Sequence, residues 1–251
     1  MLSEKPWNVE GFVRLLLGIL FCVAVFILLE AALEYFLGKD KLADGTLPNL
    51  VLGSLSLHGS ILLGTAVFLK WQHISWRDAF GFSTPPLARA ILFGFVAALV
   101  FLPLSMVLQD ISLRLLSLFH VPTSPQTAVA ELEKANSPIV RAYLAGFAVL
   151  LAPLAEEILF RGIFYTAIKQ VGLPRVALWG SSITFAVIHL SAAIFLPLVV
   201  LSLLLVWLYE KTDNLLAPIT AHAVFNGINA LFLFYGNDLM RFFNQHFSHG
   251  Q

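Results

Sequence analysis

The chain has 251 residues, of which 59% are hydrophobic and only 12% are charged, and its mean hydropathy is +0.85. Because a soluble domain usually carries about a quarter charged residues, this composition indicates a membrane protein. The formal net charge at pH 7 is zero and neither end is strongly basic or acidic, which argues against a nucleic-acid partner and a polybasic anchor. The single cysteine, Cys22, excludes an intrachain disulfide and a cysteine-cluster metal site.

The apolar runs of the chain are continuous rather than alternating, which predicts membrane-spanning helices and not a barrel. A span needs about 20 apolar residues. We therefore expect an all-α, polytopic membrane protein with about seven transmembrane helices in a single membrane domain, residues 1–251. The expected helices are 10–37, 49–69, 87–108, 138–169, 174–190, 192–210 and 215–235.

Two features of the connections bear on topology and access to a site. Residues 122–137 form the longest polar stretch, and "TAVAELEKA" within it predicts a short surface helix that could be a lid. More of the Lys and Arg residues fall on the N-terminal side of the seven-helix scheme than on the opposite side. This bias predicts a cytoplasmic N terminus.

The stretch "LAPLAEEILFRGIFY", residues 151–165, places two carboxylates and a guanidinium within an apolar helix. A charge at the centre of a span costs about 2.5–3.5 kcal/mol, so such groups usually pair or face a cavity. At about 100° per residue, Glu156 and Glu157 point in different directions. Glu157 and Arg161 have the i,i+4 spacing of an ion pair, which leaves Glu156 to face another helix as a general base.

Two later helices carry further polar side chains at helical spacing. Phe185 and His189 are four residues apart, as are His222 and Asn226. A lone intramembrane histidine is more often a hydrogen-bonding residue than a catalyst, and we assign His58 in the second helix to that class. The combination of a carboxylate, two histidines and an amide on three helices predicts instead a polar catalytic cavity between helices 4, 5 and 7.

These residues resemble the motifs of a known family. "EEILFR" at 156–161, "FAVIH" at 185–189 and "HAVFN" at 222–226 resemble the EExxxR, FxxxH and HxxxN motifs of the CPBP family of CAAX-type and Abi intramembrane proteases. That family includes the type II CAAX prenyl endopeptidases. The resemblance covers 138–235, the expected catalytic core, and implies hydrolysis of a peptide bond in a membrane-associated or lipidated substrate. We expect an integral protein of a bacterial cytoplasmic (inner) membrane.

The resemblance also implies roles for the individual residues. Glu156 and His189 would activate the water, while His222 and Asn226 would polarise the scissile carbonyl and stabilise the oxyanion. The residues assigned to support are Glu157, Arg161 and Phe185.

The cofactor stays open between zinc and none. The family has been classed as metalloproteases, and Glu156, His189 and His222 form a His₂Glu set that would leave one zinc position for water. If Glu156 were a ligand, Glu157 would have to be the base, although it points about 100° away. A metal-free glutamate mechanism uses the same residues without this difficulty, and we favour it.

Two functions from other classes compete with proteolysis. One is a non-catalytic membrane scaffold or a bacteriocin self-immunity factor. The other is a proton-coupled transporter that uses Glu156 and the histidines as a relay, although the sequence lacks a pair of broken-helix repeats. The expected partners are membrane lipid and a membrane-associated peptide or protein substrate, with no nucleic acid. The sequence predicts no oligomeric state.

Overall fold

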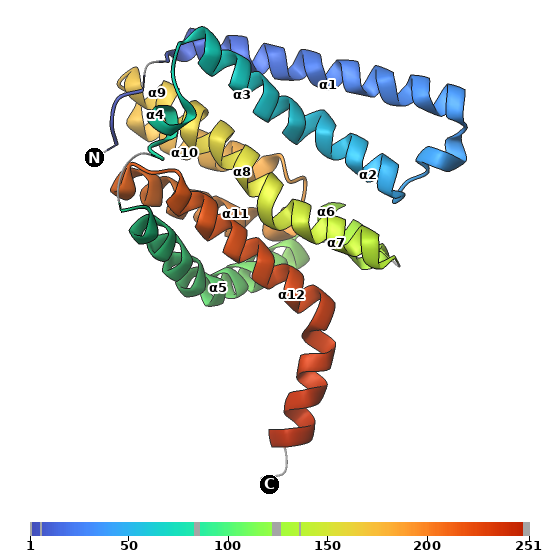
Figure 1. The fold of residues 1–251 in the computed structure, drawn as a ribbon. Coiled ribbons are helices and arrows are strands. Elements are labelled where there is room, and N and C mark those ends of the chain that lie inside the picture. Colours follow the sequence, from blue (N-terminus) through green and yellow to red (C-terminus); the bar gives the residue numbers. More distant parts are fainter. Residues whose placement is uncertain (1, 6, 83–85, 122–126, 136, 248–251) are drawn as a thin grey trace.

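The structure is a computed structural model that describes residues 2–5, 7–82, 86–121, 127–135 and 137–247 (Figure 1). Within these ranges the chain is helical and contains no strand, so the predicted all-α polytopic membrane fold is confirmed. The helices are α1 Val9–Leu37, η1 Lys39–Leu42, α2 Leu47–Ser54, η2 Leu55–Gly59, α3 Ser60–Trp71, α4 Trp76–Phe80, α5 Leu87–Leu118, α6 Thr127–Lys134, α7 Pro138–Gly146, η3 Phe147–Leu151, α8 Ala152–Glu157, η4 Ile158–Tyr165, α9 Thr166–Gln170, α10 Pro174–Val187, α11 Ala192–Thr212 and α12 Leu216–Phe247.

Six helical stretches of the described chain are long and apolar enough to cross a membrane. They are Val9–Leu37, Leu47–Trp71, Leu87–Leu118, Pro138–Gln170, Ala192–Thr212 and Leu216–Tyr235. The fifth of the seven expected helices is α10, which has only 14 residues. At 1.5 Å per residue it is about 21 Å long, less than the roughly 30 Å of a hydrocarbon core. A turn ends it early, in which Leu190 has a φ of 52°.

Two other helices continue beyond the expected spans. The sequence after residue 108, with Asp110 and Arg114 at i,i+4, predicts an interfacial extension, and α5 indeed continues to Leu118 with an exposed ion pair between Arg114 and Asp110 (2.7 Å). Pro103 lies inside α5, and Figure 1 shows the helix bent about its middle, as expected where a proline removes one helical hydrogen bond. The α12 helix passes the predicted end at residue 235 and reaches Phe247.

The span that runs from α7 to α9 lies between two groups of helices (Figure 1). On one side, α1 packs against the second span, which consists of α2, η2 and α3. On the other side lie α5, α11 and α12. Close approach of α5 and α12 depends on Gly94, because a Cβ atom there would lie 2.2 Å from the carbonyl oxygen of Ala217. This is the use of small residues expected between membrane helices.

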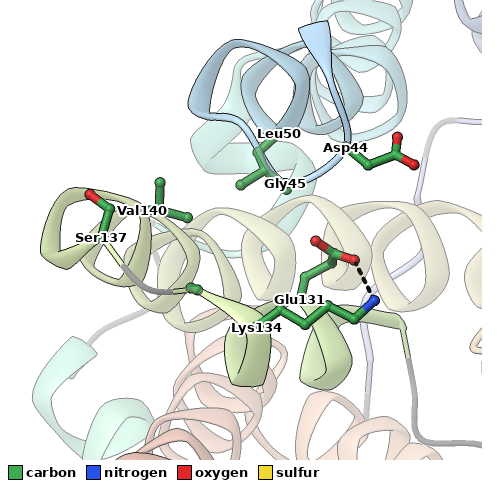
Figure 2. Close-up of a pocket in the computed structure, with 8 residues that line it drawn as sticks. Asp44, Gly45, Leu50, Glu131, Lys134, Ser137 and Val140 are labelled. Carbon is green, nitrogen blue, oxygen red and sulfur yellow. Dashed lines mark ion pairs between the residues drawn. The ribbon is translucent and has the colours of Figure 1, made fainter. Parts of the chain in front are cut away.

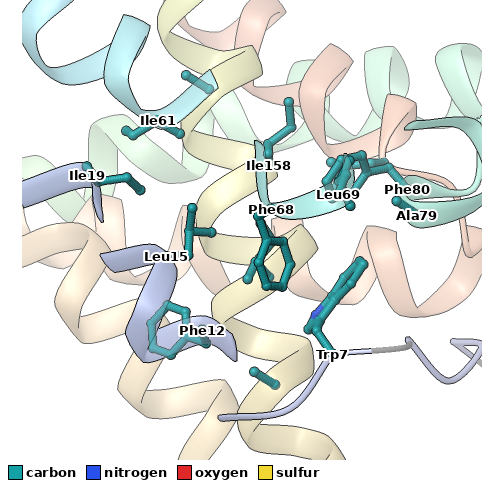
Figure 3. Packing of buried hydrophobic residues seen from close by; sticks show 14 of the residues in the cluster. Trp7, Phe12, Leu15, Ile19, Ile61, Phe68, Leu69, Ala79, Phe80 and Ile158 are labelled. Carbon is teal, nitrogen blue, oxygen red and sulfur yellow. The ribbon is translucent and has the colours of Figure 1, made fainter. Parts of the chain in front are cut away.

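A buried cluster joins the first group to the central span (Figure 3). Its labelled members come from the N-terminal segment, α1, α3, α4 and η4: Trp7, Phe12, Leu15, Ile19, Ile61, Phe68, Leu69, Ala79, Phe80 and Ile158. Trp7 also donates from Nε1 to Oγ1 of Thr166 at 2.8 Å, and the Gln170 amide donates to the carbonyl oxygens of Lys5 and Trp7, both at 3.0 Å. The N-terminal segment is thereby fixed to the end of the central span.

The predicted surface helix is present as α6, although residues 122–126 and 136 of the polar stretch lie outside the described residues. A cavity of about 340 Å³ lies between α6, the start of α2 and the start of α7, and Asp44, Leu50 and Glu131 are among the residues that line it (Figure 2). Leu132 of α6 packs in a cluster with Leu144 of α7. The role of α6 as a lid stays a prediction.

Candidate active site

The central span is not a regular α-helix around its two carboxylates. Its α8 segment, which carries Glu156 and Glu157, lies between the π-helical stretches η3 and η4. Pro153 has no N–H group to bond to the residue four positions earlier, which interrupts the regular pattern where η3 ends. Such π-helical stretches are frequent at functional sites. The sequence therefore places both carboxylates where the span departs from regular geometry.

Glu157 is the fully buried carboxylate of the pair. Its Oε1 accepts a hydrogen bond from Arg161 at 2.7 Å, so the predicted ion pair is present, and the side chains of both residues are 0% exposed. The same oxygen lies 2.9 Å from Nδ1 of His222. Glu157 thus fixes the imidazole ring of His222 on α12 in addition to neutralising the guanidinium.

Arg161 is held from two further helices. It donates from Nη2 to Oγ of Ser202 on α11 at 2.8 Å, and its guanidinium lies 4.4 Å from the ring centroid of Phe185 on α10. The Phe185 ring is completely buried and also contacts His189 and His222, with centroid distances of 4.8 and 5.7 Å. Phe185 is therefore a shared wall beside the guanidinium and both imidazoles, which fits its predicted supporting role.

Glu156 is partly exposed, with 15% of its side-chain surface accessible. As predicted, it faces another helix, but it is not unpaired: its Oε1 lies 3.3 Å from Nε2 of His58. Its Oε2 lies 3.9 Å from Nε2 of His222 and is a buried atom with no hydrogen-bond partner among the described residues. One oxygen of this carboxylate is anchored and the other is free.

His58 is the residue that sequence reasoning missed. It lies in the second span, within η2, where we assigned it only a structural role. The available signal was an ionisable side chain inside a span, the same signal that marked the other site residues. His58 has no carboxylate or amide at i,i+4, and its partner is 98 residues away in the chain, so no local spacing reveals the contact.

His189 lies directly after α10, outside the six spans, and donates from Nδ1 to the carbonyl oxygen of Phe185 at 2.6 Å. Burial lowers the pKa of His189 below its ordinary value, and the Glu156 carboxylate opposes that change. The bond at Nδ1 leaves Nε2 as the nitrogen that can accept a proton. The ring therefore offers Nε2 as its proton-accepting nitrogen.

Asn226 is one turn after His222 on α12, as the spacing predicts. Its amide nitrogen donates to the carbonyl oxygen of Ala148 in η3 at 2.9 Å. This bond uses one of the two amide hydrogens, and the other remains to contact a substrate oxygen. Glu156 thus lies beside His222. Phe185 contacts both His189 and His222, and Asn226 is hydrogen-bonded to η3. The predicted roles of all four stay predictions.

The zinc set that the resemblance left open, Glu156, His189 and His222, does not fit this arrangement. Among the residues that the structure describes, no three His, Cys, Asp or Glu side chains are grouped so that they could hold a metal ion. Glu156, His189 and His222 would have to shift to become ligands of one ion. We therefore derive no chemical step through a metal.

The comparison with protein families matches the same part of the chain. Residues 138–228 match the model of the family described as type II CAAX prenyl endopeptidase Rce1-like. The family resemblance is thereby confirmed for this region. The Rce1-like region contains Glu156, His189, His222 and Asn226 but not His58, which lies in the preceding span.

Two curated bacterial proteins are similar to the chain. The uncharacterized protein YpbD of Bacillus subtilis (strain 168) is 35% identical over 88 residues, which are 34% of this chain and 42% of the relative. The UPF0177 protein YxdF of Lactococcus lactis subsp. lactis (strain IL1403) is 32% identical over 78 residues, 31% of this chain and 42% of the relative. The matches thus span less than half of either relative. No solved structure matches the chain.

Proposed function

We propose that the chain is an intramembrane endopeptidase that hydrolyses a peptide bond of a membrane-associated or lipidated substrate. The observation that carries this proposal is the state of Glu156. Its carboxylate lies on a membrane-spanning helix with one oxygen anchored on His58 and the other unbonded beside His222. The match to the Rce1-like family over 138–228 supports the same function.

The reaction begins with a water molecule between Glu156 and His189. One of these bases takes a proton from the water as its oxygen attacks the scissile carbonyl carbon, which gives a tetrahedral oxyanion. When the C–N bond breaks, the same proton passes to the leaving amine, so the side chains return to their initial state. A preorganised base of this kind contributes typically 10²–10⁴-fold to the rate.

The oxyanion is stabilised from α12. Glu157 holds Nδ1 of His222, so that Nε2 faces the Glu156 carboxylate. In its imidazolium form the ring donates from Nε2 to the developing oxyanion, and the second amide hydrogen of Asn226 adds another donor. Removing one donor of this kind typically costs about 10²–10³-fold in rate.

The cellular setting is part of the proposal. The six apolar spans make the chain an integral membrane protein. We place it in a bacterial cytoplasmic membrane with its N terminus on the cytoplasmic side, since the Lys and Arg residues are more numerous there. Its partners are then membrane lipid and a peptide or protein substrate within the same membrane.

The test is a comparison of cells that express the wild-type protein, Glu156→Gln or the control Glu34→Gln, which changes a carboxylate at the end of α1. Membrane-peptide fragments are quantified by proteomics, and the purified proteins are assayed in liposomes with a fluorogenic farnesylated CAAX peptide and a non-lipidated transmembrane peptide. Wild type and the control cleave, whereas Glu156→Gln loses about 10²–10⁴-fold of the rate. Full activity or full cellular function of Glu156→Gln overturns the proposal in favour of a non-catalytic scaffold or immunity factor.

A further inference from the structure

The second membrane span contributes a side chain to the site although it lies outside the matched region. His58 belongs to η2, and its Nε2 lies 3.3 Å from Oε1 of Glu156 on α8. Only 12% of the His58 side chain and 15% of the Glu156 side chain are exposed. The contact is therefore a largely buried one between residues that are 98 positions apart.

The position of His58 is fixed by local structure rather than by a flexible loop. It lies in the π-helical stretch η2, and its ring packs edge-on against Phe147 of the π-helical stretch η3 at 4.8 Å. One turn earlier, Tyr143 of α7 donates to Oγ of Ser54 at 2.7 Å. Two irregular helical stretches thus meet beside Glu156, and a neighbouring hydrogen bond fixes their register. Irregular stretches of this type recur at functional sites.

We propose that His58 is a positioning residue for the proposed hydrolysis, which holds Oε1 of Glu156 so that Oε2 faces the reacting water and His222. The inference rests on the proposed function and deepens it. It assigns the α2–η2–α3 span a part in catalysis that the match at 138–228 does not contain. His58 acts only through Glu156 and has no contact with the reacting atoms in this scheme.

The hydrogen-bond chemistry gives the direction of the contact. A carboxylate can only accept, so His58 donates from Nε2. Nδ1 of His58 is buried without a hydrogen-bond partner among the described residues, which suits the neutral tautomer with its proton on Nε2, because an N–H at Nδ1 would be left unpaired. The terminal torsion of a glutamate is broad, so an unanchored Glu156 would turn its free oxygen away from the water. A misplacement of about 1 Å can cost about 10²-fold in rate.

The experiment measures kcat and KM of the full chain in liposomes with the fluorogenic farnesylated CAAX peptide. His58→Leu removes the donor and is expected to lower kcat about 10- to 100-fold with KM changed less than about twofold. His58→Gln is expected to restore most of kcat, because its amide nitrogen can donate from nearly the same place. Leu57→Ala is the matched control on the exposed face of the same stretch and keeps the wild-type kcat.

A double-mutant cycle on the melting temperature tests the contact without any substrate. His58→Leu is expected to lower the melting temperature by about 2–4 °C more in the wild-type background than in Glu156→Leu, where the acceptor is already gone. Equal shifts in the two backgrounds, or a kcat of His58→Leu equal to the wild-type value, overturn the positioning role. If Glu156→Gln still abolishes cleavage in that case, the proposed function stands. A fully active Glu156→Gln instead overturns both proposals.

Discussion

Glu156 and Glu157 are consecutive residues, yet the structure gives them opposite surroundings. Glu157 is 0% exposed, and one of its oxygens contacts both Arg161 and His222. Glu156 is 15% exposed and contacts the imidazole of His58 instead of a permanent cation. The difference follows from helical geometry, because a rotation of about 100° turns Glu157 toward Arg161 and Nδ1 of His222, and Glu156 toward His58 of the second span and Nε2 of His222. Glu157 is thus held within the packing by a guanidinium and an imidazole, while Glu156 is held by His58 and stays partly exposed.

The largest effect on stability is expected from breaking the buried pair of Glu157 and Arg161. Arg161→Met leaves Glu157 as a buried carboxylate without its guanidinium partner, which costs about 3–5 kcal/mol. The matched control is Arg114→Met, which removes a solvent-exposed pair of the same i,i+4 spacing and is expected to change stability far less. Thermal unfolding of the purified proteins in detergent measures both. Equal losses for the two variants would show that the Glu157 and Arg161 pair is no more important than a surface pair.

Part of the site could be predicted from the sequence because its signals are local. The Glu157 and Arg161 pair follows from i,i+4 spacing, and the direction of Glu156 away from that pair follows from 100° per residue. Charges inside apolar runs marked the helices that carry the site. The family motifs then supplied the roles that remain predictions.

The rest depends on packing between distant segments. The contact of His58 with Glu156 requires the π-helical stretches η2 and η3 to meet, and no spacing within the second span encodes that meeting. Ser202 reaches Arg161 across 41 residues for the same reason. The helix predicted at 174–190 is present as α10 but ends at Val187, because the backbone turns there although the apolar run continues. Hydropathy records which residues avoid water and does not record where a helix ends.

A smaller effect is expected from the serine that completes the surroundings of the guanidinium. Ser202→Ala removes the acceptor for Nη2 of Arg161 and leaves a buried charged donor unpaired, at a cost of about 1–3 kcal/mol. Ser105→Ala on α5 is the control, since Ser105 is also buried but its hydroxyl donates to the carbonyl oxygen of Leu102 in its own helix. The melting temperature should fall more for Ser202→Ala. A larger fall for Ser105→Ala would contradict the supporting role of Ser202.

The smallest effect is expected from removing zinc. The reason lies in the different surroundings of Glu156 and Glu157. If Glu156 were a metal ligand, Glu157 would have to activate the water, but its side chain is inaccessible to solvent and its charge is balanced by Arg161 at 2.7 Å. Base catalysis by Glu157 would therefore require breaking a buried ion pair at a cost of several kcal/mol. We expect active, purified protein to contain substoichiometric zinc by elemental analysis and to keep its turnover after dialysis against a chelator. Stoichiometric zinc whose removal stops turnover, and whose return restores it, would instead require Glu156, His189 and His222 to move together around the ion, and Glu157 to leave Arg161.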